Sequence, residues 1–261
     1  MNRIEAKFRD LKKKKQKAFI AFITAGYPSL AITEKLAKGF AVAGVDLVEL
    51  GVPFSDPMAD GPVIQESSQF ALKKSVNLSR ILKSVKDIRR YTGIPICLMT
   101  YYNPIFCFGE ERFMKNASLA GVDGVIIPDL PPEEGKSLLR LARKYRLDVI
   151  CFISPTTSAR RIKYIARTSR GFIYYVSLTG VTGARKRLPV GLAEHIREIK
   201  KYTSKPVCVG FGVSTHQQVK ELSRVADGVI VGSAIVKKIR QDIGRPDLVK
   251  RTLSFISALK G

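Results

Sequence analysis

The sequence is poor in the residues from which metal sites and charge-relay sites are built. Its 261 residues include four cysteines and two histidines. Three cysteines fall inside apolar runs that we expect to be strands: Cys97, Cys151 and Cys208. Cys107 falls in an expected loop, and His195 and His216 lie in helical stretches without a ligand partner nearby. Because no C-x-x-C or other ligand spacing occurs, we expect no metal site and interpret the cysteines as buried thiols that act as small hydrophobic groups.

Long apolar runs are also missing. No stretch of about 18 apolar residues occurs, which is the length that a membrane-spanning helix needs. The first residues, "MNRIEAKFRDLKKKKQKAF", lead into a strand-like segment and lack the apolar core of a signal peptide. We therefore expect a cytoplasmic protein with no membrane partner.

Acidic residues are scarce beside basic ones, with 22 Asp and Glu against 45 Lys and Arg and a formal net charge of +23. Apart from the lysines at 12–15, the basic residues are scattered over the polar sides of expected helices and loops, Arg89 and Arg90 among them. No recognition motif or aromatic interleaving accompanies them. We interpret them as a solvated basic surface with a general affinity for anions, and expect no nucleic-acid partner. A nucleic-acid-binding protein remains an alternative that only net charge favours, and its binding would have to weaken steeply with salt.

What the sequence does contain is a series of short apolar runs separated by helical patterns. The runs are residues 18–24, 46–52, 94–100, 123–129, 148–154, 171–177, 205–211 and 227–233. Near-continuous apolar runs are typical of strands that are buried on both faces of a parallel sheet. Eight such units in one chain predict a (β/α)₈ TIM barrel. An open doubly wound sheet is the alternative, but no G-x-G-x-x-G follows the first run.

We expect residues 1–261 to form one barrel domain, with an extra N-terminal helix and extra helices after the second and eighth strands. Two connections are longer than the rest. Residues 53–94 hold a Pro-rich turn and two helical patterns, and residues 178–189 look irregular. Long loops that follow the carboxyl ends of the strands are where a barrel carries its chemistry.

One carboxylate interrupts an apolar strand. In "DLVELGV", alternation places Leu47, Glu49 and Gly51 on one face. We expect this face to point into the barrel, where burial raises the pKa of a carboxyl toward neutrality and suits it to general acid–base catalysis. A structural Glu49 paired with a basic or hydroxyl group is the alternative. Asp60 follows in the loop and can reach back over the barrel mouth, although "DPMADGP" is also ordinary turn chemistry.

Three glycine-containing turns follow the last strands, at residues 179–184, 210–214 and 232–234. Glycines let backbone N–H groups approach an anion, and the third turn opens a helix whose N-terminus favours negative charge. Tight βα turns without a ligand are the alternative. Only Lys205 lies in an expected strand, at its start, so a Schiff-base aldolase is disfavoured. We predict proton-transfer chemistry on a phosphorylated small substrate.

These segments resemble the tryptophan synthase alpha chain family over nearly the whole chain. The longest motif is "VELGVPFSDPMADGPVIQ" at 48–65. Further motifs are "FITAGYPS", "MTYYNPI", "GVIIPDLPPEE", "YYVSLTGVTGAR", "VGFGVS" and "GVIVGSAIV". The resemblance implies retro-aldol cleavage of indole-3-glycerol phosphate to indole and glyceraldehyde 3-phosphate, with no cofactor on this chain. Its catalytic carboxylates match Glu49 and Asp60.

The resemblance also implies the groups that hold the substrate. Its phosphate contacts match Gly183, Gly212, Gly232 and Ser233. Its indole and propanol pocket matches Phe22, Ile64, Tyr101, Tyr174, Thr182 and Phe211. By pattern alone, Phe22, Ile64 and Phe211 would be core residues. Residues 178–189 match a mobile lid with Gly180 and Gly183 as hinges.

The implied partner is a pyridoxal-phosphate-dependent beta chain in an αββα assembly that passes indole through a tunnel. Its docking surface matches Pro53, Phe54, Asp56, Pro57 and Asn103, and we expect the turn to expose Phe54 and both prolines. Two other functions stay open. One is another phosphate-binding barrel, which would need a catalytic Lys or Cys at a strand end. The other is a chain that mainly activates the beta chain and has weak lyase activity of its own.

Overall fold

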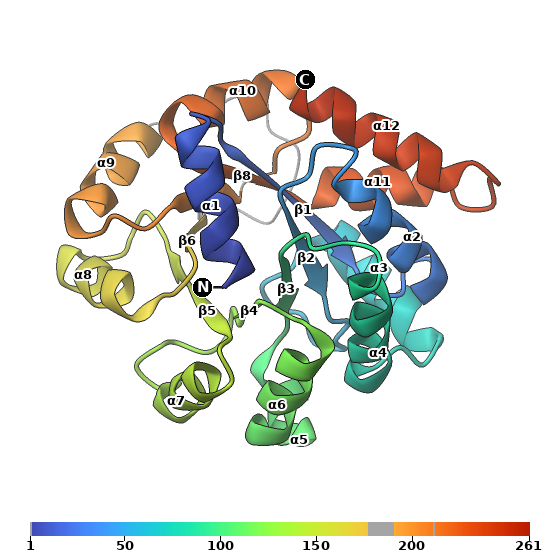
Figure 1. Ribbon diagram of the computed structural model, residues 1–261, viewed down its shortest axis with the longest axis horizontal. Coiled ribbons are helices and arrows are strands. Elements are labelled where there is room, and N and C mark those ends of the chain that lie inside the picture. Colours follow the sequence, from blue (N-terminus) through green and yellow to red (C-terminus); the bar gives the residue numbers. More distant parts are fainter. Residues whose placement is uncertain (1, 177–190, 211) are drawn as a thin grey trace.

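The computed structural model describes residues 2–176, 191–210 and 212–261, in which eight parallel strands close into a barrel in chain order. The strands are β1 (Ala18–Thr24), β2 (Leu47–Gly51), β3 (Ile96–Met99), β4 (Gly124–Ile126), β5 (Asp148–Ile153), β6 (Ile173–Val176), β7 (Val207–Gly210) and β8 (Gly228–Val231). Helices surround the barrel on all sides (Figure 1). The predicted (β/α)₈ barrel is confirmed, with each strand inside its expected apolar run.

The helices follow the strands, and several connections carry two. They are α1 (Arg3–Lys13), α2 (Leu30–Phe40), α3 (Pro62–Lys73), α4 (Leu78–Arg89), α5 (Tyr102–Phe108), α6 (Glu110–Ala120), α7 (Lys136–Lys144), α8 (Ala159–Thr168), α9 (Leu192–Tyr202), α10 (His216–Val225), α11 (Ser233–Gln241) and α12 (Leu248–Lys260). The extra helices expected at the N-terminus and after β2 and β8 are present as α1, the pair α3 and α4, and the pair α11 and α12. None of the helices in the described ranges is long and apolar enough to cross a membrane.

Helix α5 was not expected, and it changes the setting of Cys107. The sequence places Cys107 in a loop as a buried thiol, but it lies in α5 and is exposed. The helix is short and has Pro104 in its first turn, where a missing N–H costs nothing. The other three cysteines are buried in strands as expected.

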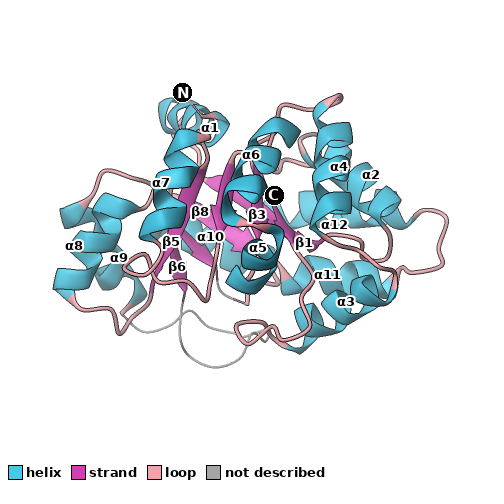
Figure 2. Ribbon diagram, turned by 90° about the horizontal axis from the view of Figure 1, so that it is seen from below, coloured by secondary structure: helices cyan, strands magenta, loops and turns pink. Residues whose placement is uncertain are grey.

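Two apolar layers result from the alternation along the strands. One lies between the strands and the helices and includes Val48 and Leu50 of β2. The other fills the barrel interior and includes Leu47 of β2, Cys97 of β3 and Cys208 of β7. The interior layer also takes in the apolar face of α1, which therefore closes the amino-terminal end of the barrel. Figure 2 shows α1 at one end of the barrel and α3 toward the opposite end.

Aspartates that precede the strands fix their register. Asp46 accepts a hydrogen bond from the Phe19 N–H at 2.9 Å, and Asp123 accepts one from the Ile96 N–H at 2.8 Å. The guanidinium of Arg89 pairs with Asp123 at 2.5 Å and donates to the Gly121 carbonyl at 2.7 Å. The Arg89 side chain is only 11% exposed. Its assignment to a solvated basic surface was wrong, since this cation ties α4 to the start of β4.

Candidate active site

Glu49 occupies the middle of β2 and points into the barrel. Its predecessor on the same face, Leu47, belongs to the interior layer, whereas Val48 and Leu50 pack toward the helices. The neighbours of Glu49 across the sheet are Phe22 of β1 and Cys97 of β3. The predicted inward face of β2 is therefore confirmed, and the acid is carried by a rigid strand.

The carboxyl group of Glu49 is enclosed and has no partner in the described part of the chain. The residue has no exposed surface, and neither of its carboxyl oxygens accepts or donates a hydrogen bond there. A buried polar group without a partner is costly, so it points to a role outside folding. Burial raises the pKa of Glu49 from 4.5 to about 8. The carboxyl is consequently protonated at neutral pH and can give a proton.

Asp60 lies in the turn between β2 and α3 and is held from the neighbouring connection. The phenol of Tyr101 donates to Oδ2 of Asp60 at 3.2 Å and accepts from the Ala59 N–H at 2.9 Å. Burial raises the pKa of Asp60 to about 6, and the hydrogen bond from Tyr101 opposes that rise. Asp60 is therefore mainly ionised at pH 7, where Glu49 is mainly protonated. Two carboxyls in different settings thus hold different charges.

Tyr174 of β6 lies within electrostatic reach of both carboxyls. It is buried in the interior layer, and its pKa is raised well above 10, first by burial and then by the negative charges of Glu49 and Asp60. Its ring lies 4.8 Å from that of Phe152. A methyl group on Gly210 would come within 2.4 Å of the Tyr174 ring and hydroxyl, so only glycine fits there. The interior at this level is walled by neutral aromatic groups.

The expected phosphate contacts that lie within the described residues occupy adjacent strand ends. Gly232 precedes α11, and Ser233 is the first residue of that helix. Gly212 follows β7, the strand that pairs with β8, and has a φ of +29°, which favours glycine. An ideal Cβ on Gly232 would lie 3.3 Å from Phe22, which pairs with Glu49. The turn that opens α11 thus lies beside Phe22, the neighbour of Glu49 on the adjacent strand.

Of the remaining expected site residues, some lie outside the part of the chain that the structure describes and two are buried. Thr182, Gly183 and Phe211, and the expected lid at 178–189, lie outside the described residues. Phe22 and Ile64 are buried, at 7% and 6% exposure. Ile64 sits in the first turn of α3 and packs in the layer between strands and helices. Burial of this kind agrees with a core residue and with a pocket wall.

The expected docking turn is less exposed than the sequence suggested. Pro53 and Pro57 are buried, and Phe54 is half-buried because its ring packs 5.2 Å from that of Tyr101. The expectation that this turn exposes both prolines was wrong, since the chain folds them back toward the barrel mouth. Asp56 and Asn103 are exposed.

Sequence reasoning missed four residues near these sites. Met58 and Phe106 are 83% and 65% exposed and belong to the two segments of the expected docking surface. Phe106 was overlooked because α5 was not expected. Cys97 and Cys208 lie inside the barrel, and Glu49 is among the groups that raise the pKa of each thiol. Alternation along each strand indicates that Cys97 and Cys208 face the barrel interior. It does not identify the residues beside them on other strands.

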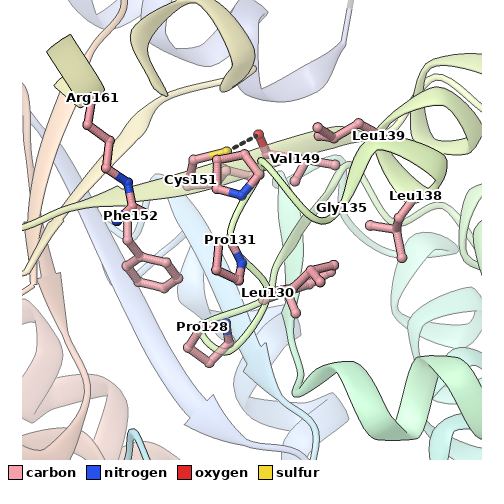
Figure 3. A pocket seen from close by; sticks show the side chains of 13 residues that line it. Pro128, Leu130, Pro131, Gly135, Leu138, Leu139, Val149, Cys151, Phe152 and Arg161 are labelled. Carbon is pink, nitrogen blue, oxygen red and sulfur yellow. Dashed lines mark hydrogen bonds between the residues drawn. The ribbon is translucent and has the colours of Figure 1, made fainter. Parts of the chain in front are cut away.

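A separate hollow lies between the β4–α7 connection and β5 (Figure 3). It is lined mainly by apolar residues, including Pro131, Leu138 and Cys151, with Arg161 at its edge. Arg161 pairs with Glu133 at 3.2 Å. Phe152 is the residue that this hollow shares with the aromatic wall beside Tyr174. Glu49 and Asp60 do not line it.

The closed barrel, with a buried carboxyl inside it and glycine turns at its carboxyl end, has the architecture of the (β/α)₈-barrel enzymes. The profile of the tryptophan synthase alpha chain family matches residues 8–259. The chain belongs to the tryptophan synthase alpha chain family. It therefore catalyses the alpha reaction, the lyase cleavage of indole-3-glycerol phosphate.

Relatives of known name match over the full length. The chain is 50% identical over 260 residues to the tryptophan synthase alpha chain of Geotalea daltonii, covering 100% of this chain and 98% of that one. It is 48% identical to that of Geobacter sulfurreducens, with the same coverage. The crystal structure of tryptophan synthase subunit alpha from Legionella pneumophila superposes with a TM-score of 0.92 at 37% identity, covering 99% of this chain and 97% of that one. A chain of Mycobacterium tuberculosis tryptophan synthase superposes with a TM-score of 0.90 at 33% identity, covering 100% of this chain and 99% of that one.

Proposed function

We propose that Glu49 is the general acid–base of the alpha reaction in this chain and that Asp60 stabilises charge on the indole ring. The observation that carries the proposal is the enclosed Glu49 carboxyl without a hydrogen-bond partner among the described residues and with its pKa raised to about 8. A group in this state holds a proton at neutral pH and has both oxygens free for a substrate.

The chemistry requires a proton at carbon 3 of the indole ring. Glu49 gives its proton to that carbon, and the ring becomes an indolenine cation with positive charge on its nitrogen. The resulting carboxylate then takes the proton of the hydroxyl on the adjacent glycerol carbon. As that oxygen forms a carbonyl, the carbon–carbon bond breaks and its electrons restore the indole. Glu49 ends protonated, so the cycle needs no other acid or base.

Asp60 is suited to the second role because it is ionised when Glu49 is not. Its pKa of about 6 makes it an acceptor for the indole N–H at neutral pH, where its charge stabilises the cation. Tyr101 holds it in place through the 3.2 Å hydrogen bond. For the substrate phosphate we propose Gly212, Gly232, Ser233 and Gly183. The N-terminus of α11 supports this, since free N–H groups and the helix dipole favour an anion.

Assay of indole release from indole-3-glycerol phosphate tests this function. We expect the purified chain to release indole and glyceraldehyde 3-phosphate in equal amounts, and to do so faster when a cognate beta chain is added. Absence of indole under both conditions, with stimulation of the beta chain intact, would contradict the proposal. That outcome would make the chain an activating subunit.

We also propose a beta-chain partner that carries pyridoxal phosphate, in an αββα assembly, with this chain acting as one domain over residues 1–261 in the cytoplasm. The four free thiols agree with a reducing compartment. We define the docking face as residues 53–58 and 102–107. It carries the exposed apolar side chains Met58 and Phe106 beside Asp56 and Asn103, and an apolar centre with polar neighbours is typical of protein interfaces.

Replacing Phe106 by Asp should weaken association with the beta chain at least tenfold, since an exposed aromatic anchor would become a desolvated charge. Calorimetric titration of the variant with the beta chain measures the change. Tyr91→Asp is the matched control, because Tyr91 is 69% exposed and lies between α4 and β3, at the opposite end of the barrel. Equal affinities for both variants would rule out Phe106 as an anchor.

A further inference from the structure

The surroundings of Glu49 inside the barrel contain two thiols that the alpha reaction does not use. Cys97 is the direct neighbour of Glu49 across the β2–β3 pairing, and its position in the interior layer places it on the same side of the sheet. Cys208 lies in β7 opposite Tyr174 of β6. Both thiols are completely buried. Each is close enough to Glu49 for the carboxylate charge to raise its pKa.

Among the strand residues that the structure describes, no basic group compensates Glu49. The titratable groups that face it are Cys97 on β3, Tyr174 on β6 and Cys208 on β7, and burial raises the pKa of all three well above its ordinary value. All three are therefore neutral at the pH of catalysis. From β1 it meets Phe22. Burial is the one cause that raises the pKa of Glu49 itself, whereas the charge of Asp60 raises the pKa of Tyr174.

A thiol differs from a hydroxyl in what it offers a carboxylate. The S–H group is a weak hydrogen-bond donor and packs like a small hydrophobic group, whereas a serine hydroxyl donates strongly. Hydrogen bonds to the ionised form of a carboxyl lower its pKa. A serine at either position would thus favour the ionised form, which cannot protonate the substrate. The cysteine sulfur fills the same space without favouring the ionised carboxylate.

We propose that Cys97, assisted by Cys208, is a positioning residue that keeps the Glu49 carboxyl protonated by enclosing it with groups that do not donate to it. The inference rests on the proposed role of Glu49. It assigns to these two thiols a part in the proton transfer without contact with the substrate. They set the pH up to which the enzyme works.

Cys97→Ser tests the inference through the pH profile. We expect its kcat for indole release to fall off about one pH unit lower on the alkaline side than that of the unmodified enzyme, since the new hydroxyl stabilises the carboxylate. Cys97→Ala cannot donate and should keep the original alkaline limb. Cys151→Ser is the matched control. Cys151 is a buried strand cysteine that faces the helices, so its replacement should leave the profile unchanged.

Infrared titration of the protonated Glu49 carboxyl, assigned by its loss in Glu49→Gln, gives a readout apart from activity. A shifted titration in Cys97→Ser together with a shifted kcat profile supports the inference. An unshifted titration in folded Cys97→Ser and in Cys208→Ser overturns it, and Cys208→Ser alone decides if the first variant fails to fold. If the titration shifts but Glu49→Gln remains active, the thiols control the protonation of the carboxyl, but the proposed role of Glu49 fails, and with it their part in the proton transfer.

Discussion

Glu49→Gln should lower kcat for indole release on the order of 10³-fold while leaving KM within a few-fold of its original value. Glutamine has the same size as glutamic acid and fits the enclosed position in β2, but it has no proton to give to carbon 3 of the indole. Because both oxygens of Glu49 lack a partner in the described part of the chain, the substitution breaks no known hydrogen bond of the fold. The loss should therefore be confined to the chemical step.

Single-turnover measurement of indole formation separates that step from product release. Glu134→Gln provides a control, since Glu134 is exposed in the β4–α7 connection, away from the barrel interior. It should retain full activity. A kcat for Glu49→Gln within tenfold of the original would exclude Glu49 as the acid, whatever the variant does to substrate affinity.

The same substitution should make the protein more stable at neutral pH. Burial raises the pKa of Glu49 from 4.5 to about 8, so the folded state disfavours ionisation. Below pH 4.5 the carboxyl is neutral in the folded and unfolded chains alike, and stability is unaffected. As the pH rises from 4.5 to 8, Glu49 loses its proton in the unfolded chain but keeps it in the folded chain. The free energy of unfolding then falls by roughly 1.4 kcal/mol per pH unit.

Between pH 4.5 and pH 7, the free energy of unfolding falls by about 3 kcal/mol in total because of Glu49, and this fall levels off above pH 8. Glutamine does not ionise, so Glu49→Gln removes this loss of stability. Denaturant unfolding of both proteins at pH 4.5 and pH 7 measures it. We expect nearly equal stability at the lower pH and a clear advantage of the variant at the higher one. A difference that is the same at both pH values would mean that packing, and not ionisation, distinguishes the two proteins.

The barrel could be predicted because each strand is buried on both faces and so forms an apolar run. The run 205–211, which holds Cys208 and Val209, and the run that holds Glu49 show this equally well. Glu49 was conspicuous because an acid breaks the second run, and alternation assigned its face correctly. Asp60 was harder, since an aspartate in a turn has ordinary reasons to be there. Its place beside Tyr101 depends on how two distant connections pack.

Other features could not be predicted, because they depend on contacts between segments remote in the sequence. The pairing of Cys97 with Glu49 needs the register of β2 and β3. The burial of Pro53 and Pro57 depends on how their turn packs over the barrel mouth. In the sequence, Arg89 looks like any surface arginine of a helix, and its ion pair with Asp123 is apparent only in the folded chain. Local pattern thus predicts elements and faces, whereas neighbours across the sheet and loop burial require the folded chain.

The proposed reaction requires Glu49 to be a protonated acid at the pH at which the enzyme works. Its most direct test is the titration of the Glu49 carboxyl in the free, unmodified protein, followed by the infrared band that Glu49→Gln lacks. We predict a midpoint near pH 8, as burial requires. A midpoint near the ordinary value of 4.5 would show that the group is already ionised at neutral pH and would contradict the proposed role of Glu49.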